Sequence, residues 1–211
     1  MRSVSLEVYR VLRGVICLGR EDSHKNMGKF ILKANQREII PFKLIEIGKK
    51  LEVVLAGENA SVEIVGLVIG KGSDEKALEA YITHAAPNTK SNVNVRAVLK
   101  DKSTFAFRGN VKIEKGSKGA DAYLRSDALL FDDAKMGDDT PALEILEPDV
   151  KAGHAATIGK VDEQMLFYLM SRGLSRKQAE EMLVEGFVRP ILDRIKGSPT
   201  LLKLRGVKKE V

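Results

Sequence analysis

Cysteine is nearly absent from the sequence, and its scarcity excludes several kinds of site. Cys17 is the only one, so neither an internal disulfide nor a Cys-X-X-Cys site for zinc or redox chemistry can form within the chain. A lone cysteine fits a reducing compartment. Long apolar runs are missing too, because none approaches the roughly 18 residues that a membrane span needs. Arginines also interrupt the N-terminal MRSVSLEVYRVLRG, where a signal peptide would be apolar. We therefore expect a soluble, cytoplasmic protein with no membrane partner.

Tryptophan is absent as well, and aromatic residues make up only 5% of the chain, so no platform for stacking single-stranded nucleic acid is visible. The formal net charge of +6 could still indicate nucleic-acid binding. The charges are segregated, however. Eight acidic residues and one lysine lie between Asp127 and Asp149, whereas the stretch from Arg194 to Lys209 is basic. We expect no nucleic-acid partner.

Short segments rich in valine, isoleucine and phenylalanine fill the chain up to about residue 160. They are too short for stable helices, and turn-forming residues separate them. This pattern predicts a mainly β domain over residues 1–160. It leaves open a sandwich, a barrel or a β-solenoid, because no strict repeat period emerges. Examples of these segments are LEVVLAG (51–57), SVEIVGLVIG (61–70), VNVRAVL (93–99) and TFAFRG (104–109).

The apolar spacing changes to that of helices after residue 160, which predicts a small helical segment over residues 161–211. Asp162 is placed to cap a first helix that ends at Gly173. A capping box, Ser175 to Gln178, opens a second helix with one apolar face. Pro190 predicts a kink or a break in that helix. Ser198-Pro199 can begin a last short helix.

A glycine-rich stretch, GLVIGKG (66–72), superficially resembles a phosphate-binding loop. Its glycines are one residue too close together, and Gly72 occupies the place of the Ser or Thr that would hold magnesium. We therefore predict a strand and its turn. HExxH and GxSxG motifs are also missing from the sequence. No catalytic constellation is visible.

Histidines and clustered aspartates offer the remaining candidate ligands. His24 lies in a polar stretch and is predicted to be solvated, whereas His84 and His154 lie in more structured contexts. On the residues alone, we favour hydrogen-bonded structural imidazoles over metal ligands for both. The acidic run lacks the alternating ligands of a calcium loop and predicts an exposed acidic turn. This run consists of Asp132, Asp133, Asp138 and Asp139.

Four segments, spread widely along the chain, resemble those of one family. They are HAAPNTKS (84–91), PALEI (141–145), DVKAGHAATIG (149–159) and LFYLMSRG (166–173). Together they are similar to the H-x-A-P-x-T-x-S, P-x-L-E-I, D-V-K-x-x-H-x-A-T-x-G and L-F-Y-L-x-S-R-G segments of the SufB/SufD family of iron–sulfur cluster assembly proteins. The resemblance spans about residues 45 to 192. Residues 1–44 match poorly, which indicates a short member that consists of the family's core.

The resemblance implies a right-handed parallel β-helix, capped by a C-terminal helical segment. It also implies a partner, because the C-terminal helices of this family dock on the ABC-type ATPase SufC. The residues that we assign to this contact are Met182, Phe187, Arg172 and Gly173. An alternative role for the same helices is to cap the open end of the solenoid, where strand edges would otherwise be exposed. The two roles are compatible.

The same resemblance separates two branches of the family. In SufB-like members, a cysteine and a glutamate are proposed to hold the nascent cluster, and the matching positions here are Ser126 and Ala155. A protonated hydroxyl is a poor substitute for a soft thiolate, so the chain resembles SufD instead. In SufD, the histidine of a D-V-K-C-x-H turn is tied to cluster assembly. His154 matches it and is the candidate metal ligand, although Ala152 replaces the usual cysteine. Cys17 matches no cysteine of the family.

Two functions remain open on this basis, and neither is an enzyme activity. The first is a scaffold that binds a SufC-type ATPase and forms a dimer with a SufB-like chain or with a second copy of itself. It would hold no stable cofactor, only a transient iron–sulfur cluster shared with its partner. The second is an adaptor that regulates the ATPase without contacting a cluster. A membrane permease is excluded, because no apolar run is long enough.

Overall fold

The computed structural model describes residues 28–44 and 48–196, which form ten β-strands and two α-helices. Cys17, His24 and Ser198-Pro199 lie outside the described residues. The strands are β1 (Lys29–Leu32), β2 (Arg37–Leu44), β3 (Lys49–Leu55), β4 (Ser61–Gly70), β5 (Glu75–His84), β6 (Lys90–Leu99), β7 (Thr104–Ile113), β8 (Asp121–Leu130), β9 (Lys135–Ile145) and β10 (Lys151–Lys160). The helices are α2 (Glu163–Ser171) and α3 (Arg176–Lys196).

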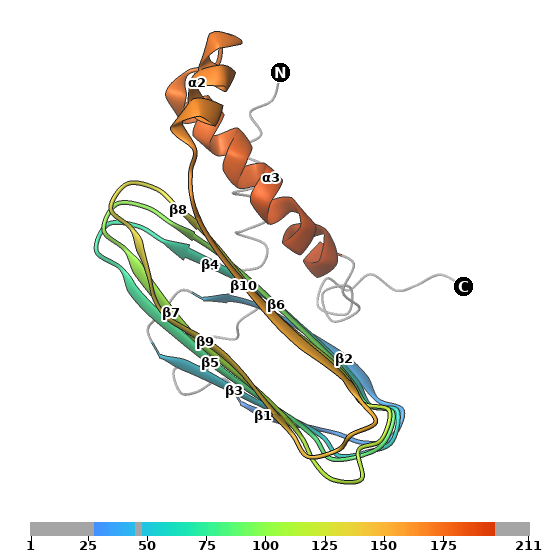
Figure 1. The fold of residues 1–211 in the computed structure, drawn as a ribbon. Helices are drawn as coiled ribbons and strands as arrows, with labels where there is room; N and C mark the ends of the chain where they lie inside the picture. Colours follow the sequence, from blue (N-terminus) through green and yellow to red (C-terminus); the bar gives the residue numbers. More distant parts are fainter. Residues whose placement is uncertain (1–27, 45–47, 197–211) are drawn as a thin grey trace.

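Successive strands alternate between two parallel sheets, so that the chain winds as a solenoid with two strands in each coil (Figure 1). Sheet A has the order β1-β3-β5-β7-β9, and sheet B has the order β2-β4-β6-β8-β10. Neighbouring strands among the described residues are parallel in both sheets, as in β4 with β6 and β6 with β8. The parallel β-helix with a C-terminal helical segment, expected from the resemblance, is confirmed. The pattern of apolar residues alone had left a sandwich and a barrel open.

A repeat of nearly constant length underlies the solenoid. In sheet B, Ser61 pairs with Lys90, Lys90 with Asp121, and Asp121 with Lys151, which are offsets of 29, 31 and 30 residues. The two corners of each coil use the left-handed backbone conformation, which asparagine, aspartate and glycine tolerate best. One corner has positive φ angles at Asn35, Asn59, Asn88 and Gly119, and the other has them at Gly72, Asp101 and Asp132.

Side chains that alternate along the strands fill the space between the two sheets. β5, β6 and β7 each bury every second residue over most of their length, as strands with one interior face do. Neighbours in register point to the same face, so that apolar side chains stack from coil to coil. Ile64, Val93 and Leu124 form one such row in sheet B, and all three are fully buried.

The first turns of the solenoid approach each other closely at Gly57. A Cβ atom there would lie 1.9 Å from the backbone nitrogen of Ala34. We predict that Gly57→Ala lowers the free energy of unfolding by about 2 kcal/mol, because backbone must move to admit the methyl group. Gly159→Ala is the matched control, since nothing lies within 4 Å of a Cβ there. Chemical denaturation measures both, and equal losses in the two variants would contradict the packing argument.

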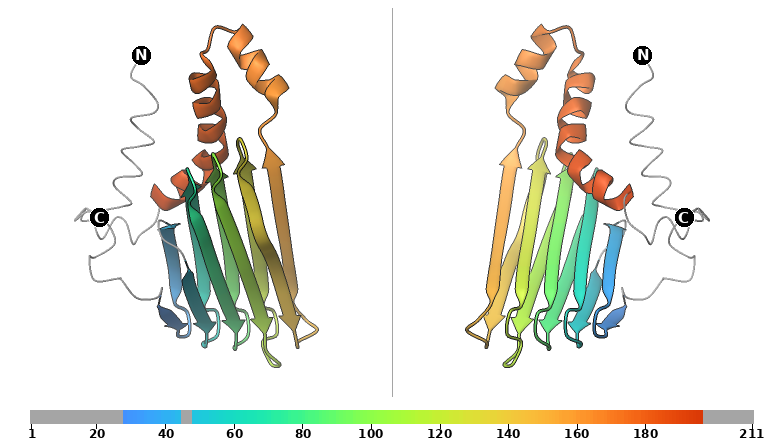
Figure 2. Two further views of the ribbon diagram at one scale, coloured as in Figure 1. Left: turned by 90° about the vertical axis from the view of Figure 1, so that its left-hand side faces the viewer. Right: turned by 90° about the vertical axis from the view of Figure 1, so that its right-hand side faces the viewer.

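Both helices begin as their sequences predict. The Asp162 side chain accepts a 2.8 Å hydrogen bond from the backbone N–H of Gln164, and Gly173 follows the end of α2 with φ of 92°. In the capping box, the N–H of Ser175 donates to Gln178 Oε1 over 2.8 Å. α3 runs continuously through Pro190, and Figure 2 shows its last turns bent away from its first. The expected effect of this proline is therefore a kink and not a break.

α3 covers part of the outer face of sheet B. Its side chains Val188, Ile191 and Leu192 form a second apolar cluster with residues of the sheet such as Val65 and Val98. α2 and the first turns of α3 project beyond the ends of the strands (Figure 2). We call α2 and α3 together the helical arm. Within the described part of the chain, neither helix is long and apolar enough to cross a membrane.

Candidate functional site

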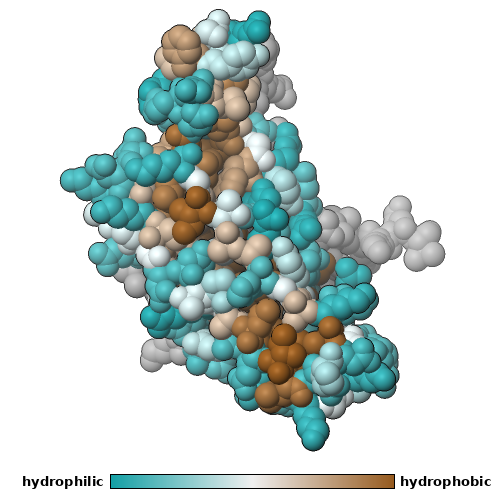
Figure 3. Space-filling view, viewed as in Figure 1, coloured by the Kyte–Doolittle hydropathy of each residue, from teal (hydrophilic) through white to brown (hydrophobic). Residues whose placement is uncertain are grey.

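The solenoid ends in two strands that each have one unpaired edge. Among the described strands, β9 pairs with β7 alone, and β10 pairs with β8 alone. Large apolar side chains remain exposed here, at Ile145, Leu146 and Ile158. In Figure 3, which looks toward β9 and β10, apolar patches lie between polar ones on this surface. We call this surface the open end.

His154 lies at the open end, in the middle of β10. It pairs in register with Leu124 of β8, and so it extends the inward-facing row of Ile64, Val93 and Leu124 by one residue. Those apolar residues are buried, whereas His154 is exposed, because no further coil of the described chain covers it. The sequence-based candidate for cluster assembly therefore occupies a position that a partner at this end could contact.

Ser126 lies one layer deeper at the same end, and Asp139 lies on the terminal strand β9. Ser126 is buried in β8, in register with Ala156 of β10, and Asp139 of β9 is in register with the buried Phe107. Burial raises the pKa of Asp139, and the nearby hydroxyl of Ser126 opposes that rise. Neither oxygen of this carboxylate has a well-aligned hydrogen bond among the described residues.

The acidic run that we expected to form one exposed turn is divided between two elements. Asp132 lies in the corner after β8, where its carboxylate accepts a 3.2 Å hydrogen bond from the N–H of Asp101. Asp138 and Asp139 lie in β9 instead, so that part of the expectation is wrong. The pairing of β9 with β7 shifts register between Phe105 and Phe107, so inward and outward side chains do not alternate regularly along β9. The inward position of Asp139 was missed for this reason.

His84 is a structural histidine, as its sequence context favoured. Its imidazole is fully buried, with Nδ1 2.8 Å from Thr89 Oγ1 and Nε2 2.8 Å from Ser91 Oγ. The Thr89 hydroxyl donates to the carbonyl of Ala86 over 3.0 Å, so Nδ1 is the donor to Thr89 and Nε2 accepts from Ser91. Burial lowers the pKa of His84 to about 4. The HAAPNTKS segment thus builds an interior hydrogen-bond network.

The helical arm presents an apolar surface to solvent. In α2, only Leu166 is buried, and Phe167 is 73% exposed. Arg172, at the end of α2, lies over the ring of Tyr168 with 5.2 Å between guanidinium and ring centre. Met182 of α3 is exposed as well. We call this surface the arm surface; its exposed apolar residues are Met165, Phe167, Tyr168, Met170 and Met182.

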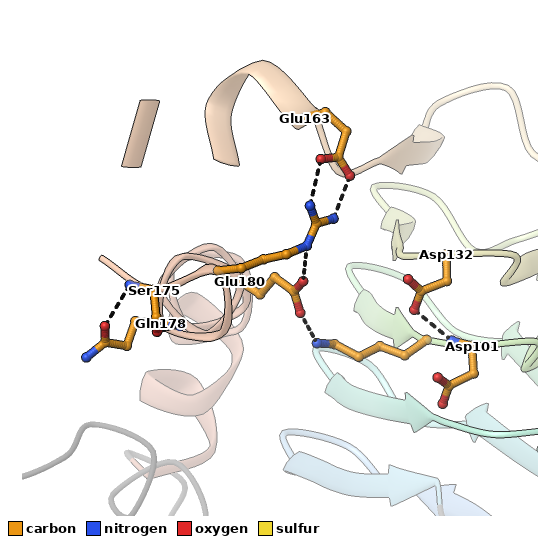
Figure 4. A network of polar contacts seen from close by, with 8 residues as sticks. Asp101, Asp132, Glu163, Ser175, Gln178 and Glu180 are labelled. Carbon is orange, nitrogen blue, oxygen red and sulfur yellow. Dashed lines mark hydrogen bonds and ion pairs between the residues drawn. The ribbon is translucent and has the colours of Figure 1, made fainter. Parts of the chain in front are cut away.

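Charged side chains hold the arm together and fix it to the solenoid. Arg176 of α3 donates two hydrogen bonds to Glu163 of α2, over 3.1 and 2.8 Å, and a third to Glu180 over 3.2 Å. Glu180 in turn accepts from Lys100, just after β6, over 2.9 Å. Figure 4 shows this continuous chain of ion pairs from α2 to sheet B.

The four residues assigned to ATPase contact lie in two different environments. Arg172, Gly173 and Met182 are exposed around the junction of α2 and α3. Phe187 is half-buried against sheet B, with the guanidinium of Arg96 5.1 Å from its ring centre. The sequence-based assignment included Phe187 and left out Phe167 and Tyr168, which the structure shows to be exposed. Their signal was the apolar LFYL run, which supplies only one buried side chain.

No group of three or more His, Cys, Asp or Glu side chains that could hold a metal ion occurs within residues 28–44 and 48–196. The ligand role of His154 stays a prediction.

Comparison with known proteins agrees with this architecture. The model of the SufBD core domain, described as SUF system FeS cluster assembly, matches residues 46–187. The chain belongs to the SufB/SufD family. The matched part covers the solenoid from β3 onward, α2 and the first half of α3, so it includes both the open end and the arm surface.

Relatives from both branches of the family are similar to this chain. SufD of Bacillus subtilis is 34% identical over 157 residues, which is 74% of this chain and 34% of that protein. SufB of the same organism is 36% identical over 150 residues, 68% of this chain and 32% of that protein. A SufBD family protein of Mycobacterium tuberculosis is 40% identical over 139 residues, 66% of this chain and 16% of that protein. The chain thus spans about a third or less of the length of these relatives.

Proposed function

We propose that this iron–sulfur cluster assembly protein is a non-catalytic, SufD-like scaffold subunit. In this role it binds a SufC-type ABC ATPase through the arm surface and pairs at the open end with a SufB-like chain or a second copy of itself. The observation that carries the proposal is the match of the SufBD core to residues 46–187, which include both surfaces.

The arm surface supports ATPase binding. Its exposed phenylalanine, tyrosine and methionines are among the side chains that dominate the energy of protein interfaces. The ion pairs of Arg176 with Glu163 and Glu180 keep α2 and α3 in a defined arrangement, which lowers the entropy lost on binding.

The open end supports pairing with a second chain. β10 has the sequence KAGHAATIGK, in which lysines stand only at the two ends and the middle has small side chains without proline or acidic residues that would protect the edge. β9 contains Pro141 and two aspartates, so it is the better protected of the two edges. We therefore expect the main-chain hydrogen bonds of the partner to form with β10.

The cluster would be cargo at this junction and not a resident cofactor. His154 would supply one nitrogen ligand from the open end, and thiolates would come from the partner. We predict that His154→Ala lowers the yield of cluster on the complex reconstituted with a SufB-like chain about tenfold or more. Thr157→Ala, also exposed on β10, is the matched control. Iron and sulfide content measure the yield, and an unchanged yield in His154→Ala would remove the ligand role.

A second candidate function is an adaptor that regulates the ATPase and touches no cluster. The observation in its favour is Ser126, a buried hydroxyl at the position that the resemblance matches with the cluster cysteine of SufB. Co-expression with a SufC-type ATPase and a SufB-like chain separates the two functions. A complex that accumulates iron supports the scaffold, and a complex with altered ATPase activity but no iron supports the adaptor. Failure to form any complex would contradict both.

A further inference from the structure

Among the described residues, three polar contacts join α3 to sheet B and to the corner after β6, near the apolar cluster of Val188, Ile191 and Leu192. Lys100 binds Glu180 over 2.9 Å, and Arg194 binds Glu63 over 3.3 Å. The third point is Arg96 of β6, which donates a hydrogen bond to the backbone carbonyl of Phe187. Lys100 and Arg194 hold the two ends of the contact, and Arg96 holds its middle.

Arg96 binds α3 where the helix is weakened. Proline at position 190 cannot donate to the carbonyl four residues earlier, and its ring distorts the preceding turn. The carbonyl of Phe187 lies in that turn, and the guanidinium of Arg96 binds it and also covers the ring of the same residue at 5.1 Å. Arg96 therefore fixes α3 at its kink, where a small rotation of the helix displaces the projecting arm most.

Behind Arg96 lies a buried carboxylate that belongs to a different strand. Asp127 of β8 is 3% exposed, and its Oδ2 is 3.6 Å from Arg96 Nε. Arg125 Nε donates to both oxygens of the same carboxylate, over 3.0 and 2.8 Å. Asp127 thus lies between two guanidinium groups, so a shift of Arg96 with α3 changes the charge balance around this buried carboxylate, although Arg125 stays bound to it.

Asp127 and its neighbour Ser126 point to opposite faces of sheet B. Successive residues of a strand point to opposite faces, so Ser126 faces the interior, where it is buried beside Asp139 of β9. Arg96 is thus connected on one side to the kink of α3, and on the other, through Asp127 and Ser126, to the interior of the open end.

We propose that Arg96 and Asp127 form a positioning pair, which sets the direction of the helical arm and couples its movement to the last coils of the solenoid. The pair takes no part in ligand binding. This inference deepens the proposed function, because it names the residues through which an ATPase bound to the arm would act on the open end. The geometry of the pair itself does not depend on that partner.

The test uses the full chain without any ATPase, so that its failure is distinct from failure of the proposed function. Spin labels at Gln164→Cys in α2 and Lys151→Cys in β10, in a Cys17→Ser background, report the direction of the arm. Arg96→Met is expected to broaden the distance distribution. It is also expected to accelerate hydrogen exchange at Ser126 and Asp127 about tenfold, because β8 loses its link to α3.

Lys100→Met is the matched control, since it removes another anchor of α3 that does not touch Asp127. It is expected to leave exchange in the middle of β8 within about threefold of the parent. Should Arg96→Met fail to fold, Arg96→Lys keeps the charge but cannot bind Asp127 and the Phe187 carbonyl together, and a broadened distribution is still expected. The proposal would be overturned if Arg96→Met, or Arg96→Lys where Arg96→Met does not fold, had the same distance distribution and exchange rates as the parent.

Discussion

Phe167→Asp is expected to weaken binding of a SufC-type ATPase about a hundredfold or more and to leave the fold intact. Phe167 is 73% exposed, which is the highest exposure among the apolar residues of the arm surface. Large aromatic residues in such positions are frequent hot spots, whose loss costs about 2 kcal/mol or more of binding energy, and a buried aspartate adds a desolvation penalty. Isothermal titration calorimetry with the purified ATPase measures the effect.

Phe30→Asp provides the matched control. Phe30 is also an exposed phenylalanine, at 38%, but it lies on β1 at the other end of the solenoid. Both variants are expected to unfold at nearly the same temperature as the parent, because surface substitutions change stability by about 0.5 kcal/mol or less. If Phe30→Asp impaired binding as much as Phe167→Asp, or if neither did, the arm surface would not be the ATPase site.

His84 is expected to contribute a fall of about 3 kcal/mol in the free energy of unfolding as the pH drops from 6.5 to 4. The pKa of His84 lies at about 4 in the folded protein and near 6.5 in the unfolded chain, so only the unfolded chain gains the proton within this window. Stability is thus fully present above pH 6.5 and is lost as the pH falls toward 4, at about 1.4 kcal/mol for each unit of pKa difference. Urea denaturation at a series of pH values measures the slope.

His84→Gln retains groups that can hydrogen-bond to Thr89 and Ser91 but has no titrating ring. It is expected to be less stable than the parent at pH 7 and to lose most of the slope between pH 6.5 and 4. An undiminished slope in His84→Gln would mean that other groups cause the acid sensitivity.

The local features of the helical arm could be predicted because their determinants lie close together in sequence. The Asp162 cap and the Ser175 to Gln178 box each require residues two or three positions apart, and both form as expected. The direction in which a helix face points was harder to predict. An apolar stripe shows that Phe187 shares a face with its neighbours, but not that this face packs on sheet B.

The solenoid itself could not be derived from the pattern of apolar residues. Equivalent corner positions hold different residues, such as Asn88 and Gly119 at one corner and Gly72 and Asp101 at the other. They share a backbone conformation, whereas the side chain recurs at only some of them, such as Asn59 and Asn88 or Asp101 and Asp132, so the sequence shows no strict repeat. The family resemblance supplied the fold and the candidate His154. It did not reveal Asp139, whose inward position depends on the irregular register of β9 with β7.

The ion pair between Arg194 and Glu63 joins two residues that lie far apart in the sequence, on the last helix and on an early coil. Solenoids usually unfold in sections, because each coil contacts only its neighbours. Here α3 returns across β4 and β6 and closes the chain into a ring of contacts. Fraying that begins at either end must therefore break this long-range closure, so the early coils and the helical arm should lose their structure in one cooperative step.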